Sequence, residues 1–443
     1  MSADTERVLK IAEIACEAAI RAGAEYADAA AQHGQSRSVS VEKNAIKSSD
    51  ARQWGAVSVR AFFSGATGWS SASGLSEEAA RSAGAQAAEL ARAAEPDPDF
   101  VDLVSPEELP VVEGLYDPRL AEVTSDQIAA WVMGNIDSAL AVAGDAVVQG
   151  GAGVRWSQWA LVNNLGVRVS QRSGSASVSA DVVIRRGDDV GSFYEWDSAR
   201  SLTDLIPENL GATAAEEALK YLKSRVITTT TLPVVLGPRS GMALLGSLCG
   251  AASAEEVQRN RSFLIGKLGE QVASEHVTLV DDPLIPGGLG SGTCDGDGFP
   301  HRRVTLVERG VLKTYLHSHY TARKGNAGNT GHSTRGGISA TNVIPTLGAK
   351  TAAEIIAEVD DGIYITLGRL SPDTASGQVS AMVDAGFRIR KGKLTHPLKN
   401  TMVAGHGLEL LANIDAISSD YRAEPGMVLP TVRVQGVRVA GGG

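Results

Sequence analysis

The sequence predicts an α+β protein with an N-terminal domain of repeated helix–antiparallel strands–helix units, followed by a β-rich C-terminal domain. Three observations lead to this fold class. In the first half of the chain, amphipathic helical segments enclose runs of alternating apolar and polar residues, and this order occurs twice. Beyond Arg225 the sequence is rich in glycine and in short β-branched runs, as expected for strands joined by tight turns. At 443 residues the chain is also too long for one ordinary hydrophobic core.

Residues 1–95 form the first predicted unit. Apolar residues at helical spacing predict helices over 4–22 and 76–94, and alternation predicts strands at 36–44 and 54–63 between them. The second helix has a clear start, because a serine is followed by two glutamates in the first turn.

Residues 96–122 carry five prolines among acidic residues, which predicts an extended linker. Residues 123–224 then repeat the order of the first unit, with helices over 125–143 and 202–223. The strand candidates between these helices are 146–150, 153–162, 165–172 and 175–187. We therefore predict an internal structural repeat.

Residues 225–443 form the predicted C-terminal domain. Its elements are a buried strand at 232–236, a hairpin over 301–318 turning at 308–310, a helix over 351–358, a hairpin over 377–400 turning at Lys391-Gly392, a helical turn within 406–418, and a strand at 431–439.

The strand at 232–236 is followed by Gly237-Pro238 and then, from Gly241, by a helix of small residues. A zinc peptidase would place two histidines, four or five residues apart, and a glutamate on such a helix. The corresponding positions hold Gly246, Ser247 and Ala251. None of these side chains binds zinc or activates water, so we expect no catalytic residue on this helix.

Composition excludes several classes of function. The formal net charge of −10 argues against a nucleic-acid surface, and no apolar run is long enough to span a bilayer. The first residues lack the apolar core of a signal peptide. The three cysteines, Cys16, Cys249 and Cys294, are widely spaced, which predicts reduced thiols in a cytoplasmic protein. We expect Cys249 to be a core residue, because no base lies near it in sequence.

Several motifs then occur in a fixed order between residues 232 and 405: VVLGP, VERGVLKTYL, YTARK, TGHSTRGG, TNVIP and KLTHPLKN. In this order and spacing the chain resembles the TldD/PmbA family of peptidases and their partners. In that family, TldD-type chains carry an HExxxH zinc motif on the helix after the VVL strand and a further cysteine ligand near the C-terminus. TldE/PmbA-type chains lack the metal site. Here the motif positions hold Gly246, Ser247 and Ala251, and residues 420–436 contain no cysteine. The chain therefore resembles the TldE/PmbA type.

This resemblance implies a non-catalytic subunit of a TldD/TldE-type zinc metallopeptidase, which cleaves unfolded or extended peptides in a channel between subunits. The implied partner is a TldD-like zinc peptidase subunit in a heterodimer, and a homodimer stays open. Zinc is expected in that partner, and no cofactor is expected in this chain. Substrate specificity would come from the loops around 286–300 and 325–337. From these loops the predicted substrate-binding residues are Asp295, Asp297, Asn329, Thr330, His332 and Arg335.

Two other functions stay open at the level of sequence. His317 and His319 form an HxH pair at a predicted strand end, where both rings would point to one side. With a third ligand from His301, His332, Asp281 or Asp282, the pair would make an autonomous metallohydrolase. The other alternative is a non-enzymatic homodimeric binding protein. Asp295 and Asp297 faintly resemble a calcium loop but lack its distal glutamate, so a glycine-and-aspartate turn is favoured.

Overall fold

The computed structural model describes residues 3–442 and has the predicted α+β fold. The first unit contains α1 (Ala3–Arg21), β1 (Tyr26–Glu42), β2 (Ala45–Phe63), β3 (Ala66–Ser73) and α2 (Glu77–Ala93). After a 3₁₀ helix, η1 (Pro118–Ala121), the second unit contains α3 (Ser125–Val142), β4 (Ala146–Asn163), β5 (Arg168–Arg186), β6 (Asp189–Ala199) and α4 (Leu210–Lys220). The order helix, three strands, helix thus occurs twice, which confirms the predicted repeat.

The C-terminal domain is rich in short strands. Its elements are β7 (Thr230–Leu236), α5 (Pro238–Ala251), α6 (Ala254–Gln258), β8 (Leu279–Asp281), β9 (Val304–Glu308), β10 (Val311–Leu312), α7 (His319–Lys324), β11 (Val343–Pro345), α8 (Ala352–Ala357), β12 (Asp361–Leu367), β13 (Gln378–Met382), β14 (Ala385–Arg390), β15 (Lys393–Pro397), β16 (Thr401–His406), α9 (Gly407–Ala412), β17 (Ile414–Glu424) and β18 (Met427–Gly441).

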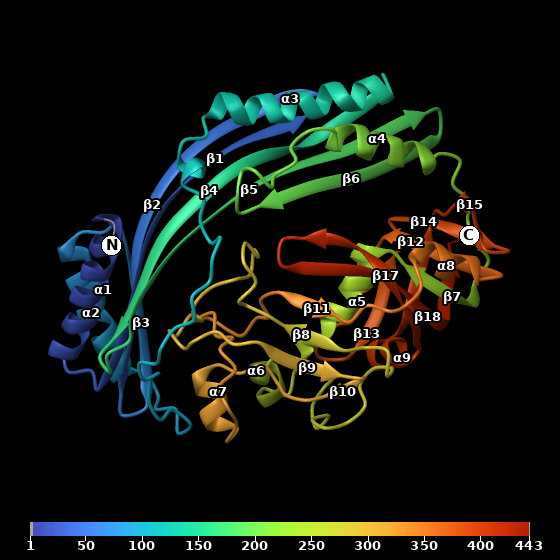
Figure 1. Cartoon of the computed structure of the whole chain (residues 1–443). Coiled ribbons are helices and arrows are strands. Elements are labelled where there is room, and N and C mark those ends of the chain that lie inside the picture. Colours follow the sequence, from blue (N-terminus) through green and yellow to red (C-terminus); the bar gives the residue numbers. More distant parts are fainter. Residues whose placement is uncertain (1–2, 443) are drawn as a thin grey trace.

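The two N-terminal units share one antiparallel sheet, with the strand order β3-β2-β1-β4-β5-β6. They join through β1 and β4, whose register runs from Asp28 opposite Asn163 to Val41 opposite Gly150. At one edge, β3 pairs only with residues 56–63 of β2, so the first half of β2 has a free side. Figure 1 shows this sheet curving over the C-terminal domain, with the helices of both units on its convex face.

Small residues let the helices pack closely on this sheet. Ala29, Val57 and Val59 point to the convex face and are fully buried against α1 and α2. A Cβ atom added at Gly84 of α2 would lie 2.2 Å from the carbonyl oxygen of Ala15 in α1, so only glycine permits this helix contact. The alternate residues of the same strands face the concave side.

The strands are longer than the sequence predicted. The candidates at 146–150 and 153–162 are one strand, β4, which runs through Gly150 and Gly151 without a change of register. The candidates at 165–172 and 175–187 likewise form β5, and β6 had no predicted counterpart. Glycine and serine weaken the alternation on which a strand prediction depends, while pairing on both sides holds such residues extended.

In the C-terminal domain, β7 lies inside the largest sheet, parallel to β12 and antiparallel to β18. A second sheet has the order β10-β9-β8-β11. The helix α5 begins at Pro238 and not at Gly241, because proline fits the first helical position and needs no hydrogen-bond partner there. The predicted turn at Lys391-Gly392 is confirmed, with φ values of 49° and 72°.

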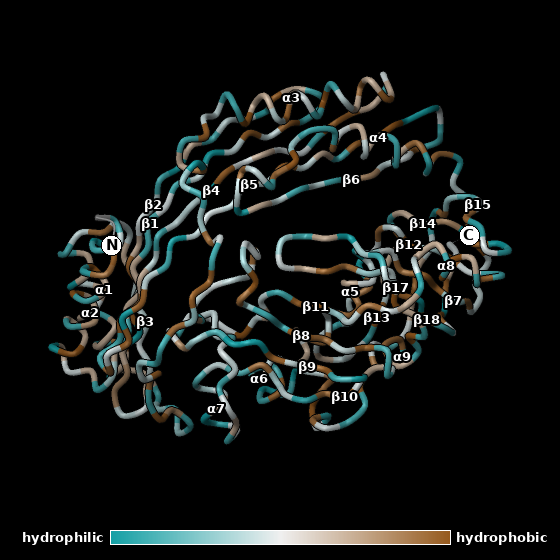
Figure 2. Tube along the Cα trace, in the orientation of Figure 1, coloured by the Kyte–Doolittle hydropathy of each residue, from teal (hydrophilic) through white to brown (hydrophobic). Residues whose placement is uncertain are grey.

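Residues 96–117 contain no helix or strand, and side chains anchor part of this segment to α7. The phenol of Tyr320 donates to Asp97 at 2.7 Å, and the ammonium of Lys324 lies 2.7 Å from Asp99. No helix within residues 3–442 is long and apolar enough to cross a membrane. Figure 2 shows hydrophilic residues interspersed with hydrophobic ones along the helices of the convex face.

Candidate functional site

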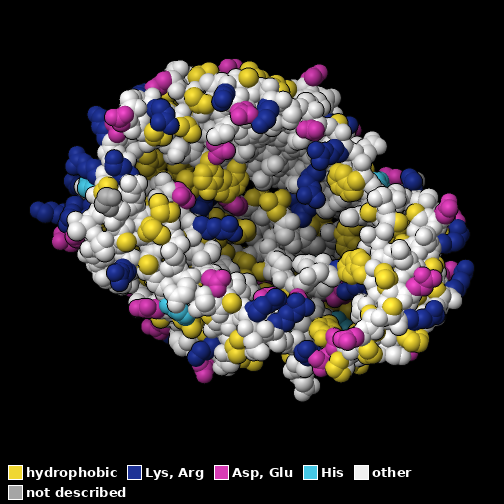
Figure 3. Space-filling view, turned by 180° about the vertical axis from the view of Figure 1, so that it is seen from behind, with side chains coloured by type: hydrophobic (Ala, Val, Ile, Leu, Met, Phe, Trp, Pro, Cys, Tyr) yellow, Lys and Arg dark blue, Asp and Glu magenta, His cyan; other side chains and the backbone are white. Residues whose placement is uncertain are grey.

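A cavity of about 860 Å³ lies between the concave face of the N-terminal sheet and the loops of the C-terminal domain. We call it the large cavity. Its sheet wall includes Gln32, Ser58, Trp69, Ser71, Trp159 and Gln171, and its other wall consists of residues from 290–301 and 332–341. This volume is typical of ligand sites in proteins. The space-filling view shows the molecule hollowed near its centre, with hydrophobic and basic side chains around the hollow (Figure 3).

Strand geometry explains why these side chains meet. Ser58 alternates with the buried Val57 and Val59, so it points to the concave face. One hydrogen-bonded contact fixes the opposite loop on the sheet: Oε1 of Gln171 accepts from the amide of Thr293 at 2.9 Å and from its hydroxyl at 3.2 Å. The cavity is therefore bounded by the sheet and by a loop that is hydrogen-bonded to it.

A second cavity of about 360 Å³, the small cavity, adjoins the large one. Residues from the segment 97–104 and from α7 line it. Trp69, Ser333, Arg335 and Gly336 line both cavities. The side chain of Arg335 therefore lies at the boundary between the two spaces.

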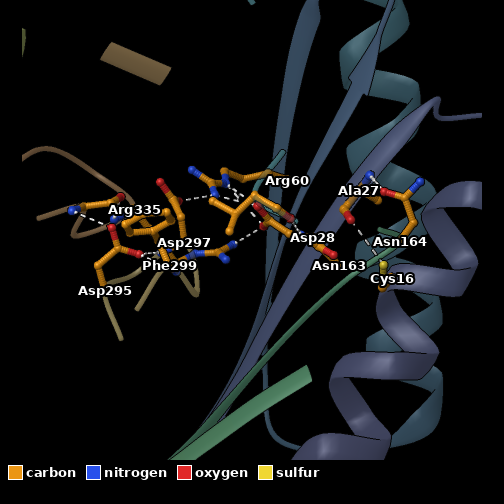
Figure 4. A network of polar contacts seen from close by, with 12 residues as sticks. Cys16, Ala27, Asp28, Arg60, Asn163, Asn164, Asp295, Asp297, Phe299 and Arg335 are labelled. Atoms are coloured by element: carbon orange, nitrogen blue, oxygen red, sulfur yellow. Dashed lines mark hydrogen bonds and ion pairs between the residues drawn. The ribbon is translucent and has the colours of Figure 1, made fainter. Parts of the chain in front are cut away.

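Four charged side chains form a network at this boundary (Figure 4). Arg60 of β2 donates to Asp28 of β1 through Nε at 3.0 Å, and its Nη2 donates to Asp297 at 2.6 Å. Nη2 of Arg335 lies 2.8 Å from Oδ1 of Asp28. Burial disfavours the charge of Arg60, but the two carboxylates outweigh burial and hold its pKa above the ordinary value. The network joins the sheet to both predicted substrate loops.

Asp295 has a structural role in the turn of the first loop. Its Oδ1 accepts from the amides of Asp297 at 2.9 Å and Phe299 at 3.0 Å, and its Oδ2 accepts from the amide of Ser333 at 3.1 Å. Burial, with the adjacent charge of Asp297, raises the pKa of Asp295 to about 7. The carboxylate builds the turn that the sequence predicted, and through Ser333 it also holds the two loops together, which was not predicted.

His332 is fully buried in a chain of polar contacts. Its Nε2 lies 2.8 Å from Oδ2 of Asp281, and its Nδ1 lies 2.9 Å from the hydroxyl of Thr330. Asp281 also accepts from the amide of Thr341 at 2.7 Å. His301 lies in the wall of the large cavity, and burial is the main cause that lowers its pKa to about 4.

The assumption behind the alternative metal site is wrong, because His317 and His319 do not lie on a strand. Ser318 caps α7, and His319 is the first residue of that helix. The ring of His317 contacts Thr321, with Nδ1 and Oγ1 3.3 Å apart, whereas Nε2 of His319 lies 2.7 Å from Asp102. Within residues 3–442, no three side chains of His, Cys, Asp or Glu are grouped as metal ligands.

The structure separates the predicted substrate-binding residues. Asp295, His332 and Arg335 line the large cavity, and Asp297 lines the small one. Asn329 and Thr330 line neither. The sequence analysis missed the sheet side of the site, above all Trp69, Trp159 and Gln171. A signal was present in β3, where Thr67, Trp69 and Ser71 alternate with buried small residues.

The helix α5 holds the three positions that correspond to a zinc motif. Gly246 and Ser247 are partly exposed, and Ala251 is fully buried. The hydroxyl of Ser247 donates to the carbonyl oxygen of Leu244 at 2.6 Å. Because a glycine and an alanine offer no ligand atom, these residues do not fit a zinc ion. Cys249 is buried among apolar residues, and burial raises its pKa to about 12, so the thiol is not a ready nucleophile.

Three segments of the chain match domain families. Residues 27–91 match PmbA/TldA metallopeptidase domain 1, residues 118–222 match the central domain, and residues 229–441 match the C-terminal domain. Together these matches cover most of the chain.

Individual proteins show the same relationship. The crystal structure of TldE from Thermococcus kodakarensis has a TM-score of 0.88 and 25% identity, covering 97% of this chain and all of that one. A metalloprotease PmbA homolog of Haemophilus influenzae is 25% identical over 100% of this chain and 98% of its own length. Metalloprotease MJ0996 of Methanocaldococcus jannaschii is 32% identical over 49% of this chain, and the match spans about half of that relative's length.

Proposed function

The chain belongs to the PmbA/TldD metallopeptidase family, and we propose that it is a TldE/PmbA-like, non-catalytic subunit that holds unfolded or extended peptides for a zinc-bearing partner. The observation that carries this proposal is that α5 has no metal-ligand side chain at the positions of the zinc motif. A helix in the position of a hydrolytic centre offers Gly246, Ser247 and Ala251 where metal ligands would be needed.

The large cavity supports the peptide-binding half of the proposal. One wall contains two indole rings, Trp69 and Trp159, which offer apolar contact area, and several uncharged polar side chains. Such a surface suits peptides of varied sequence, because it makes few demands on side-chain charge.

The free edge of β3 supports an extended peptide in particular. β3 is the last strand of its sheet, so within residues 3–442 no strand pairs with the backbone on its outer side. An extended peptide gains main-chain hydrogen bonds when it adds to such an edge, whatever its side chains are. Trp69 and Ser71 place this strand in the wall of the large cavity.

The partner in this proposal is a TldD-like chain that supplies zinc. The likeness to TldE of Thermococcus kodakarensis over the whole chain supports this subunit type. The test is to purify the chain alone and with a TldD-like partner from the same genome, and then to measure bound zinc and the hydrolysis of an unstructured peptide. We expect zinc and hydrolysis only when the partner is present. Stoichiometric zinc in the isolated chain, or hydrolysis by a homodimer, would contradict the proposal.

Peptide binding by the cavity is tested separately. Ser58→Trp places a large ring in the large cavity, and Ser49→Trp places the same ring at an exposed position on the opposite face of β2. We expect Ser58→Trp to weaken binding of a fluorescent unstructured peptide at least about tenfold, and Ser49→Trp to leave it unchanged. Equal affinities of the two variants would place peptide binding elsewhere.

A further inference from the structure

The small cavity has an apolar wall as well as charged side chains. This wall consists of three rings and two aliphatic side chains, namely Phe62, Trp69, Phe100, Leu103 and Val104. The rings of Phe62 and Phe100 are stacked, with their centroids 4.3 Å apart. At about 360 Å³ the cavity is at the lower end of the volumes that are usual for ligand pockets. Because it adjoins the large cavity, it is suited to one side chain or one end of a peptide held there.

Nearly every charged side chain that lines the small cavity has a partner of opposite charge. The ion pairs are Arg60 with Asp28 and Asp297, Arg335 with Asp28, Arg259 with Glu255, Lys324 with Asp99, and Asp102 with His319 and Arg323. Within residues 3–442, Asp97 is the one carboxylate of this lining that forms no ion pair. The charges of the other groups balance one another, so the negative charge of Asp97 is left in excess.

Asp97 is attached to two sides of the cavity and keeps part of its hydrogen-bonding capacity. Its backbone amide donates to the carbonyl oxygen of Gly65, in the turn between β2 and β3, at 3.1 Å. Its Oδ2 accepts from the phenol of Tyr320 at 2.7 Å, and its Oδ1 accepts from the amide of Asp99 at 2.9 Å. A carboxylate accepts about four hydrogen bonds, so each oxygen has room for one more donor. Asp97 is also partly exposed, so a donor in the cavity can reach it.

A carboxylate beside an apolar wall favours a group that is apolar along its length and positively charged at its end. Lysine and arginine side chains have this composition. The apolar stem of such a side chain can lie against Phe100 and Leu103 while its charged end donates to Asp97. A charged donor gains a stronger hydrogen bond to a carboxylate than a neutral donor does. An acidic side chain would instead be repelled, because the charge of Asp97 is not balanced.

We propose that the small cavity binds a positively charged group of the peptide, with Asp97 as its ionic partner and the apolar wall in contact with the rest of that group. This inference rests on the proposed peptide-holding function, and it names the class of peptide that this function would select. Two sources share this chemistry, namely a lysine or arginine side chain and the free N-terminal ammonium group.

The test uses the full chain and fluorescent peptides of one uncharged sequence with both ends blocked. In one set a lysine occupies each position in turn, and matched sets carry norleucine or glutamate at the same positions. A further peptide is uncharged and has a free N-terminus. We expect a lysine at one position, or the free N-terminus, to tighten binding about tenfold relative to the neutral peptide, and glutamate at that position to weaken it. A preference for lysine identifies a side chain, and a preference for the free amine identifies the N-terminus.

The variant Asp97→Asn should reduce this ratio of affinities to about one, because it removes the charge and keeps the shape of the side chain. Asp188→Asn removes an exposed carboxylate from the turn between β5 and β6 and should leave the ratio unchanged. Equal binding of charged and neutral peptides, or a ratio that survives in Asp97→Asn, overturns this inference and leaves the peptide-holding function standing. If no peptide binds at all, the proposed function fails, and the inference fails with it.

Discussion

Nε2 of His319 lies 2.7 Å from Oδ1 of Asp102, which joins the segment between the two N-terminal units to the start of α7. Arg323, one turn later in that helix, donates to the other oxygen of the same carboxylate at 2.6 Å. Asp102 and His319 both line the small cavity, so their contact closes one side of it.

Asp102→Asn should weaken the attachment of the segment between the two N-terminal units to α7. Burial raises the pKa of Asp102, but His319 and Arg323 outweigh it and hold the pKa below 3.8. A depressed carboxyl pKa gives stability that is present above 3.8 and is lost as the pH falls through the folded value. At neutral pH we expect limited proteolysis within residues 105–113 to be faster in the variant. Glu107→Gln is the control, since Glu107 makes only an exposed contact of 3.7 Å with Arg302. An unchanged cleavage rate in Asp102→Asn would contradict the anchoring role.

The network at the boundary of the cavities predicts that replacing its two arginines lowers the free energy of unfolding by unequal amounts. Arg60→Gln leaves two largely buried carboxylates without their main partner, which costs about 3–5 kcal/mol of unfolding free energy. Arg335→Gln removes a single contact and should cost no more than about 2 kcal/mol. Urea unfolding of both variants measures the difference, and equal losses would contradict the asymmetry between the arginines.

The burial of His301 predicts that the folded protein becomes less stable as the pH decreases. Its pKa is lowered from 6.5 to about 4, mainly by burial, so between these values the unfolded chain binds a proton that the folded chain does not. Unfolding is therefore favoured as the pH falls from 6.5 towards 4, by roughly 2–3 kcal/mol. His301→Gln should remove this part of the pH dependence, and the exposed His276→Gln should not. Unfolding free energies at pH 7.5 and 5 for the three proteins provide the measurement.

Two glycines of α5 predict opposite effects of the same substitution. A Cβ at Gly246 would meet only the methyl of Met242 at 3.6 Å, so Gly246→Ala should stabilise the protein by about 0.5–1 kcal/mol. A Cβ at Gly241 would lie 2.9 Å from the carbonyl oxygen of Pro430, so Gly241→Ala should destabilise it by about 1–3 kcal/mol. Thermal unfolding distinguishes the two, and a shift in the same direction for both would be inconsistent with the packing of α5.

Local signals in the sequence were sufficient where one residue decides the geometry. Ser76 was predicted to begin a helix, and its hydroxyl accepts from the amide of Ala79 at 3.1 Å. Lys391 and Gly392 were predicted to form a turn, and both have positive φ values. In β1, by contrast, Ala29 and Ala31 are buried and Ala30 faces the cavity, so identical residues hide which face each one takes.

The candidate site was only half predictable for a related reason. Arg335 and Asp297 were found because their glycine-rich loops are unusual in composition. Trp69 is in an ordinary edge strand, and it contributes to the site only because the sheet curves over loops that follow it by more than two hundred residues. His317 and His319 failed as a pair because a helix cap at Ser318 turns the chain between them.

The free side of β2 has a consequence for solubility. Among the described residues, no neighbouring strand covers this edge over 45–55, and an open edge allows another molecule to add its own strand. Lys47, Asp50 and Arg52 lie along that stretch, where an approaching chain would have to desolvate them. These charged side chains therefore oppose fibril-like stacking between molecules. A variant in which they are replaced by neutral residues is the one in which we would first look for precipitation.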